Sequence, residues 1–366
     1  MRVEVEDALF APAHDLGLFE LFGLGWEERH AILVDEQGPR WTAWIARVEQ
    51  ALPHVAAKLK QTIEDSLQLS TVQSSACASV RVVSGEASDW SDGQLALDAA
   101  IRLLRFPLRL LVENQRADFD FLLCVARPTE REWLREMWRR GWLEVQGAGG
   151  LGEIEACLQD LLASLSGTDG EPGDLVRVEV VRLRLWVMFD RDADPSDRSQ
   201  PSTASRRVAD LCNDSLFSRP WPLAHLQLAR RTIESYLPGA ALAAWVGERR
   251  GAERTRRQRA LDALTRLRTD APGAAFQYNM KRGFIGDRTR HAAPDDPLVA
   301  SDIDPLFASA SDAGHRGARH RIRAIKRPFE SVFSHFGDAA FDSEFRRGPT
   351  TQPERKAIIQ SIRDRI

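Results

Sequence analysis

The stretch that most limits how this 366-residue chain can fold is an apolar run that ends in alternating aspartates. Residues 185–188 read Leu-Trp-Val-Met, and residues 189–195 read Phe-Asp-Arg-Asp-Ala-Asp-Pro. Such a run indicates a buried strand that passes into a loop, and ligands and metals bind where the strands of parallel α/β sheets end. Carboxylates this close repel one another unless a cation lies among them. The sequence therefore predicts a divalent-metal site, with Asp190 and Asp192 as its first candidate ligands.

Composition indicates a globular protein of two or three domains, because 43% of the residues are hydrophobic and ten are Trp. No stretch approaches the roughly 20 apolar residues that a membrane span needs, and no signal segment opens the chain. The four cysteines form no CxxC pair, which argues against a zinc site or a disulfide framework. We therefore expect a cytoplasmic protein with no membrane partner.

The net charge of −3 conceals an uneven distribution along the chain. From residue 248 onward there are 24 Lys and Arg against 16 Asp and Glu, an excess of eight positive charges, so the first 247 residues carry a net −11. A basic C-terminal region beside an acidic site suits a protein that handles phosphodiesters. Solvated helix faces would explain the same distribution, and both interpretations stay open.

The pattern of apolar residues divides the chain into three regions. Residues 1–106 are expected to be a mainly helical N-terminal region, in which Pro53 kinks or breaks an amphipathic helix. Residues 241–366 are expected to be a basic, mainly helical C-terminal region. Between them, short apolar runs alternate with helical segments, and the expected strands are 108–112, 142–145, 183–189 and 223–228. This alternation favours an α/β fold with a doubly wound, Rossmann-like parallel sheet, and we find no internal repeat.

Glu113 stands at the end of the first of these strands, and Asp190 stands at the end of the third. In a right-handed parallel sheet these strand ends lie on the same edge, so the two carboxylates can meet at one ion. Mg²⁺ prefers oxygen ligands and keeps several waters, so a few carboxylates are enough to hold it. The alternative is that these acids form turns and cap helices. We favour metal binding because four acids, including Asp192 and Asp194, follow the two strands.

This order of elements resembles the Toprim domain, which topoisomerases, DnaG-type primases and OLD-like nucleases share. The resemblance covers residues 107–240 and is carried by four segments: Leu-Leu-Val-Glu113-Asn, Gly147-Ala-Gly-Gly-Leu-Gly-Glu-Ile, Val-Met-Phe-Asp190-Arg-Asp192-Ala-Asp194, and Arg-Arg-Thr-Ile-Glu234-Ser-Tyr-Leu-Pro. The last segment is similar to an element of the nuclease members that topoisomerases and primases lack. The resemblance implies a Toprim fold with Mg²⁺- or Mn²⁺-dependent phosphodiester cleavage.

The resemblance also implies roles for individual residues. The implied metal ligands are Glu113, Asp118, Asp190, Asp192, Asp194 and Glu234, and the implied catalytic residues are Glu113, Asp190, Asp192 and Lys281. Lys281 would face the scissile phosphate and offset the charge of the transition state, although a surface lysine is the alternative. For Glu234 the alternative is a cap or an ion pair with the neighbouring arginines.

The sequence departs from the family pattern at two positions near the first acid. Asn114 stands where the family commonly has Gly, and Ala117 stands where nuclease members often have Asp. Asp118 or Asp120 would then take the role of the missing acid, and we favour Asp118. Asp194 stands where some relatives have Glu or Gly, which makes it the least certain ligand of the set.

Two further features are consistent with binding of phosphate groups. The Gly-rich loop 147–152 opens a helix, where backbone N–H groups can bind phosphate, but a tight structural turn is an equal alternative. Basic residues near the start of the C-terminal region form the expected nucleic-acid contacts: Arg249, Arg250, Arg254, Arg256, Arg257 and Arg282.

These observations predict a metal-dependent endonuclease that cleaves DNA or RNA (tRNA included). By resemblance to stand-alone Toprim effectors of bacterial antiphage systems, we expect a separate ABC- or AAA-type ATPase partner, and a homo-oligomer is left open. Two alternatives are kept. One is a nucleotidyltransferase of the primase type, and the other is a catalytically inactive nucleic-acid-binding adaptor.

Overall fold

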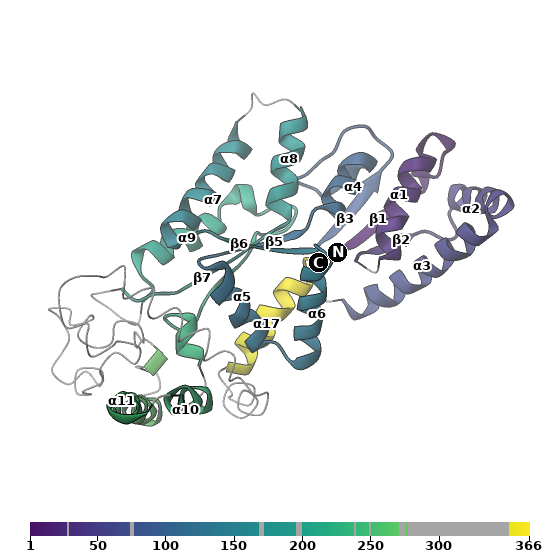
Figure 1. The fold of residues 1–366 in the computed structure, drawn as a ribbon. Helices are drawn as coiled ribbons and strands as arrows, with labels where there is room; N and C mark the ends of the chain where they lie inside the picture. Colours follow the sequence, from purple (N-terminus) through teal and green to yellow (C-terminus); the bar gives the residue numbers. More distant parts are fainter. Residues whose placement is uncertain are drawn as a thin grey trace.

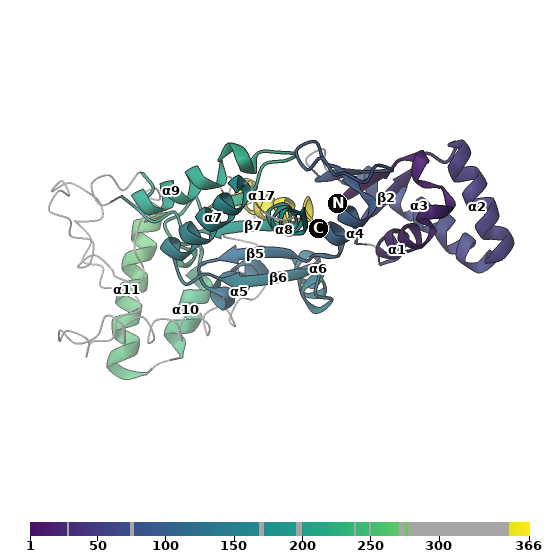
Figure 2. The same ribbon diagram turned by 90° about the horizontal axis from the view of Figure 1, so that it is seen from above.

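The structure is a computed structural model, and it describes residues 1–27, 29–73, 77–167, 172–194, 200–237, 239–248, 250–270, 275–276 and 351–366. Within these residues the chain forms two four-stranded parallel sheets with helices packed on them. Figure 1 shows the half built on the first sheet beside the half built on the second, with both ends of the chain between them. Seen from above, the two halves follow one another along an elongated molecule (Figure 2).

The first sheet has the strand order β2-β1-β3-β4, and every pair in it is parallel. Its strands are β1 (Arg2–Val5), β2 (Ala31–Val34), β3 (Ser79–Val83) and β4 (Gln94–Ala96). In β1 and β3 buried valines alternate with the exposed residues Glu4 and Arg81, so these two strands bury only one face. The prediction of a mainly helical region 1–106 therefore missed a sheet. Its strands are three to five residues long, and in β1 and β3 charged or polar residues alternate with valine, which leaves only short apolar runs to recognise.

Helices α1 to α4 accompany the first sheet. They are α1 (Asp15–Trp26), α2 (Pro39–Ala51), α3 (Pro53–Val72) and α4 (Leu97–Arg105), with the short 3-10 helices η1 (Asp7–Leu9) and η2 (Pro12–His14) before them. The expected break at Pro53 is confirmed, because α2 ends at Ala51 and α3 begins at the proline. Proline is tolerated in the first turn of a helix, where its missing N–H would have no partner.

The second sheet has the order β6-β5-β7-β8 and is also entirely parallel. Its strands are β5 (Leu108–Val112), β6 (Leu143–Gly147), β7 (Leu185–Phe189) and β8 (Ala224–Gln227). The helices between these strands are α5 (Gln115–Val125), α6 (Pro128–Arg139), α7 (Leu151–Ser166), α8 (Pro172–Leu183) and α9 (Thr203–Cys212), and the 3-10 helices are η3 (Ser215–Phe217) and η4 (Ile233–Tyr236). The predicted parallel α/β core and its four strands are confirmed, with ends shifted by one or two residues.

Helices cover both faces of the second sheet, so all five residues of β7 are buried. On one face Trp186 and Met188 pack with residues of α5, α6 and the C-terminal helix α17 (Thr351–Arg363). On the other face Val187 and Phe189 pack with residues of α7 and α9. A strand that is buried on both faces is a continuous apolar run, which is why the sequence identifies β7 clearly.

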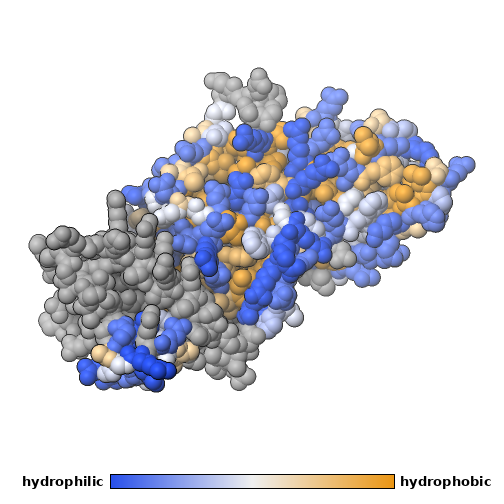
Figure 3. Space-filling view, in the orientation of Figure 1, coloured by the Kyte–Doolittle hydropathy of each residue, from blue (hydrophilic) through white to orange (hydrophobic). Residues whose placement is uncertain are grey.

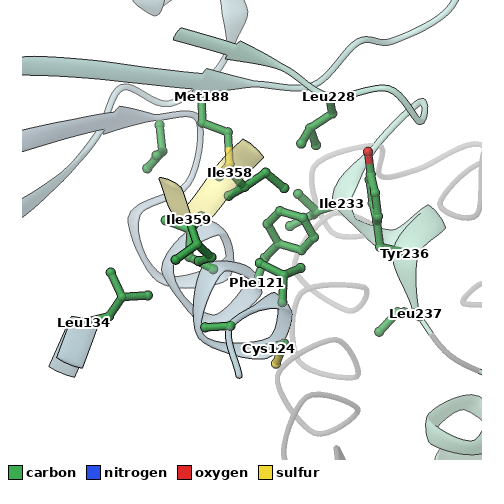
Figure 4. Packing of buried hydrophobic residues seen from close by; sticks show 14 of the residues in the cluster. Phe121, Cys124, Leu134, Met188, Leu228, Ile233, Tyr236, Leu237, Ile358 and Ile359 are labelled. Carbon is green, nitrogen blue, oxygen red and sulfur yellow. The ribbon is translucent and has the colours of Figure 1, made fainter. Parts of the chain in front are cut away.

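The region after residue 240 contributes to the core of the second half. Its described helices are α10 (Gly239–Gly247), α11 (Gly251–Asp270) and α17. Figure 4 shows Ile358 and Ile359 of α17 beside Met188 and Phe121, and the Trp186 indole N–H donates a hydrogen bond of 3.0 Å to Ser361 Oγ. The last helix is therefore packed into the core of the predicted middle region. No helix in the described ranges is long and apolar enough to cross a lipid bilayer.

The two sheets repeat one topology. Numbered within its own half, each sheet has the strand order 2-1-3-4, and in each half two successive helices connect the second strand to the third. The halves differ after the third strand, where α9 lies between β7 and β8 while residues 84–93, all described, contain no helix. The repeat could not be seen in the sequence because it lies in the order of the elements rather than in the residues.

Buried arginines join the two halves at the end of α4. The Phe106 carbonyl accepts hydrogen bonds from Arg29 of the first half and from Arg184, which precedes β7 and is fully buried. The neighbouring Leu104 carbonyl accepts a hydrogen bond of 2.9 Å from His30 Nε2. The last carbonyls of a helix have no partner within the helix and carry partial negative charge, so donors and cations are stabilised there.

Candidate functional site

Glu113 and Asp190 lie side by side at the carboxyl-end edge of the second sheet. Val112 and Met188 are register partners in the neighbouring strands β5 and β7, so the strands deliver the two acids to one place. The Asp190 backbone N–H donates a hydrogen bond of 2.9 Å to Glu113 Oε1. The sequence prediction that these two acids share an edge is confirmed by this contact.

The segment after β8 brings Glu234 to the same edge. The Ile233 backbone N–H donates to Asp190 Oδ1 over 3.2 Å, so Glu234 is the direct neighbour of a residue that touches the Asp190 carboxylate. Glu234 belongs to η4 and is only 4% exposed. Around it, Arg230 stacks on the ring of Tyr236 with 4.6 Å between guanidinium carbon and ring centroid. The four-residue helix η4 therefore buries an acid at the position next to Ile233, whose N–H contacts Asp190.

The loop that follows Asp190 is fixed by backbone contacts. Asp192 has φ of 46°, a left-handed conformation that Asp tolerates better than most residues, and its N–H donates to the Arg231 carbonyl over 2.9 Å. Asp194 is differently placed, because its carboxylate forms an ion pair of 3.1 Å with Arg206 of α9. Asp192 is thus tied to the segment that holds Glu234, whereas Asp194 is tied to a helix.

Asp118 has a structural role at the start of α5. Its Oδ2 accepts a hydrogen bond of 2.7 Å from the Asn114 N–H, while Asn114 Oδ1 accepts one of 3.1 Å from the Ala117 N–H. These reciprocal bonds resemble a capping box and satisfy N–H groups at the helix start that have no partner within the helix. Asp118 is only 6% exposed. The geometry supports helix capping for Asp118, the alternative weighed for these acids.

The Gly-rich loop makes close contacts within the protein. Gly149 and Gly150 have φ of 105° and 147°, which L side chains rarely adopt, and a Cβ at Gly147 would lie 2.8 Å from the Gln115 nitrogen. The Gly149 N–H donates to the Glu113 carbonyl over 2.9 Å. The glycines are therefore explained by a tight turn that passes beside Glu113 before α7 begins at Leu151.

A buried serine contacts Asp190 from behind and a half-buried glutamine contacts that serine, and sequence analysis found neither. Ser205 of α9 is fully buried and donates a hydrogen bond of 2.8 Å from Oγ to the Asp190 carbonyl. The last residue of β8, Gln227, donates from Nε2 to Ser205 Oγ over 2.9 Å. A serine in a helix gives no sequence signal of such a contact, because its partners come from two distant strands.

The carboxyl-end edge of the second sheet, with Glu113, Asp190, Asp192 and Glu234, is called the acidic edge, and its capacity to hold a metal ion depends on how many of these carboxylates meet. No three or more His, Cys, Asp or Glu side chains in the described parts of the chain lie close enough together to hold a metal ion. A complete protein cage is therefore not formed. Mg²⁺ is commonly held by one or two carboxylates with waters and substrate phosphates, and Glu113 and Asp190, which are in contact, could be such a pair.

The basic residues of the C-terminal region divide into exposed and buried ones. Arg250 and Arg254 are exposed, and Figure 3 shows hydrophilic residues where α11 reaches the surface. Arg257 is buried, with its guanidinium carbon 3.8 Å from the centroid of the Trp245 ring and its Nε 2.9 Å from Glu253 Oε1. The predicted nucleic-acid contact is therefore wrong for Arg257, which packs α11 on α10. Arg249, Lys281, Arg282 and the Arg256 side chain lie outside the described residues.

The corresponding edge of the first sheet carries the same hydrogen bond with different neighbours. Glu6 follows the first strand as Glu113 follows β5, and its Oε2 accepts a hydrogen bond of 2.8 Å from the Ser84 N–H, where Ser84 follows the third strand as Asp190 follows β7. The adjacent Asp7 caps α2, since its Oδ1 accepts the Trp41 N–H over 2.9 Å. At this edge serine replaces aspartate, and the acids cap backbone groups.

Comparisons with protein families, with curated proteins and with solved structures found nothing that matches this chain. The residues at the acidic edge are therefore the basis for assigning a function.

Proposed function

We propose that the chain is a divalent-metal-dependent nuclease of the Toprim type, whose phosphodiester-cleaving site lies at the carboxyl-end edge of the second sheet. The observation that carries the proposal is the hydrogen bond of 2.9 Å between the Asp190 N–H and Glu113 Oε1, which joins acids from two neighbouring strands. A carboxylate has more acceptor positions than one N–H occupies, so this bond is compatible with metal binding.

In this proposal Glu113 and Asp190 hold the ion, and each is oriented by a backbone N–H that its carboxylate accepts. Bound Mg²⁺ or Mn²⁺ supplies Lewis-acid polarisation of a phosphoryl oxygen and lowers the pKa of a water. Glu234 and Asp192 add negative charge beside this pair and would be the source of further ligands. Exposed arginines such as Arg250 and Arg254 would contact the phosphate backbone of the substrate.

The test is cleavage of nucleic acid by the purified chain. Plasmid DNA, single-stranded DNA and tRNA are each incubated with Mg²⁺, with Mn²⁺ or with EDTA. We expect cleavage of at least one substrate with a metal ion and none with EDTA. Asp190→Asn should abolish cleavage while the far-ultraviolet circular dichroism spectrum stays unchanged, because the amide oxygen can still accept the Ile233 N–H. Cleavage retained in Asp190→Asn would overturn the assignment.

The same experiment separates the two alternatives. Binding of nucleic acid without cleavage under any metal condition would support an adaptor. Incorporation of labelled nucleotides in place of cleavage would support a nucleotidyltransferase. A separate ATPase partner belongs to the proposal as well, and co-purification with a neighbouring ATPase tests it independently of the cleavage assay.

A further inference from the structure

Among the described residues, hydrogen bonds contact the backbone N–H, the carboxylate and the backbone carbonyl of Asp190. Glu113 accepts its N–H, the Ile233 N–H donates to its carboxylate, and Ser205 donates to its carbonyl. The first two contacts involve residues of the acidic edge itself. The third comes from α9, behind the edge, and is the only one of the three that is made by a side-chain hydroxyl.

A second hydrogen bond, from the half-buried Gln227, fixes the direction of the Ser205 hydroxyl. Because Gln227 Nε2 donates to Ser205 Oγ over 2.9 Å, the hydroxyl hydrogen is directed to the Asp190 carbonyl, 2.8 Å away. Gln227 and Phe189 are register partners in β8 and β7, so the glutamine is anchored one residue before Asp190 on the neighbouring strand. The Ser205 N–H is in turn accepted by Ser202 Oγ at the start of α9.

The first half lacks this arrangement. Ser84, the counterpart of Asp190, is followed by residues 85–93, which are described and form no helix that could place a hydroxyl behind it. The backbone support by α9 is thus found at the edge that carries Asp190 and not at the edge that carries serine. A role restricted to the acidic edge explains this difference better than a general requirement of the fold.

We infer that Ser205, with its hydroxyl directed by Gln227, is a positioning residue that fixes Asp190 for cation binding. The inference rests on the proposed function. Residues that orient a metal ligand without touching the metal typically contribute about 10–100-fold to metal affinity. Removing the Ser205 hydroxyl frees the Asp190 peptide to rotate and so loosens the orientation of the carboxylate.

The experiment is a titration of the full chain with Mn²⁺ alone, in which electron paramagnetic resonance measures the concentration of free Mn²⁺. We expect Ser205→Ala to weaken Mn²⁺ binding about 10–100-fold. The matched control is Ser164→Ala, which removes an exposed serine hydroxyl that donates to the Asp160 carbonyl within α7 and should leave the affinity unchanged. Thermal unfolding without metal checks that each variant is folded.

A second variant keeps the test decisive if Ser205→Ala does not fold. Gln227→Glu leaves Ser205 in place but offers a carboxylate that accepts the hydroxyl, which turns it away from the Asp190 carbonyl. We expect weaker Mn²⁺ binding by about the same factor. Wild-type affinity in either folded variant would overturn the positioning role alone, whereas absence of Mn²⁺ binding by the wild-type chain would overturn the proposed function and this inference together.

Discussion

The carboxyl-end edges of the two sheets contain an equivalent hydrogen bond, but the residues around that bond differ between the two edges. In each half the glutamate after the first strand accepts the N–H of the residue after the third strand, at 2.8 Å for Glu6 and 2.9 Å for Glu113. At the first edge that residue is Ser84, and the neighbouring Asp7 caps a helix. At the second edge it is Asp190, with Asp192 and Glu234 nearby.

The comparison shows that the glutamate contact is part of the fold, since the first half has the contact although its third strand is followed by Ser84 and not by an acid. The contact between Glu113 and Asp190 brings the two acids together but does not by itself require a metal ion. What distinguishes the second edge is the aspartate at the third strand, the buried Glu234 and the support of Asp190 by α9. Variants at equivalent positions of the two halves therefore separate a structural role from a functional one.

The largest expected difference between the halves is in catalysis. Glu113→Gln and Glu6→Gln each keep an amide oxygen that can accept the same N–H, but each removes one negative charge. We expect Glu113→Gln to lower the rate of metal-dependent cleavage about 100-fold or more. This is the size of the rate loss when an enzyme loses one group that stabilises charge in the transition state. Glu6→Gln should stay within about twofold of wild type, as surface substitutions usually do. Equal effects of the two changes on cleavage rate would remove the distinction between the edges.

The next difference is in stability, where we expect both changes to destabilise the fold, with the larger loss in the second half. Glu113→Ala leaves the Asp190 N–H without its acceptor, and we expect the free energy of unfolding to fall by about 1–3 kcal/mol. Glu6→Ala should cost about 1 kcal/mol or less, because Glu6 is more exposed and water replaces the lost acceptor. Urea unfolding followed by circular dichroism measures both. An unchanged stability in Glu113→Ala would show that the hydrogen bond contributes nothing to the fold.

The junction between the halves predicts a pH dependence. Burial, together with the positive charges of the Met1 amino group, Arg184 and Arg29, holds the pKa of His30 well below its usual value of 6.5. The folded protein therefore keeps His30 neutral at a pH where the unfolded chain takes up a proton. Stability from this group is complete above pH 6.5 and is lost as the pH falls below it, by at most about 1.4 kcal/mol per pH unit.

His30→Gln tests this dependence, since the glutamine amide can still donate to the Leu104 carbonyl but does not titrate. The free energy of unfolding is measured between pH 7 and pH 5 for wild type, for His30→Gln and for the control His225→Gln, which changes a half-buried histidine in β8. We expect a smaller loss of stability on acidification in His30→Gln only. The same slope in all three proteins would contradict a neutral, buried His30.

The sequence predicted the second half better than the first for a physical reason. Strands β5 and β7 of the second sheet are buried on both faces. Each is therefore a short apolar run, and its length and lack of polar alternation identify it as a buried strand. In the first sheet, Arg2-Val-Glu-Val5 alternates charge with valine, and β4 has only three residues. Residues 175–183 of helix α8 are rich in Val and Leu, so their pattern does not separate a helix from a strand, and it is packing on α7 and α4 that distinguishes the two.

At the site, strand order predicted that Glu113 and Asp190 meet, because that depends only on parallel pairing and register. Asp118 was assigned to the metal by resemblance, yet its carboxylate accepts the Asn114 N–H at the start of α5. Ser205 and Gln227 were not predicted, since their contacts join a helix and a strand that no local pattern connects. Local patterns thus locate strand ends but not the residues that support them.

Mn²⁺ titration of the wild-type chain and of Asp190→Asn tests most directly whether the second edge binds a divalent ion. Asp35→Asn serves as control, because Asp35 lies at the first edge and accepts the Gln37 N–H within its own turn. We expect wild type and Asp35→Asn to bind Mn²⁺ with the same affinity, and Asp190→Asn to bind it about 100-fold more weakly or not at all. Equal affinity in all three proteins, or no binding by wild type, would contradict this expectation.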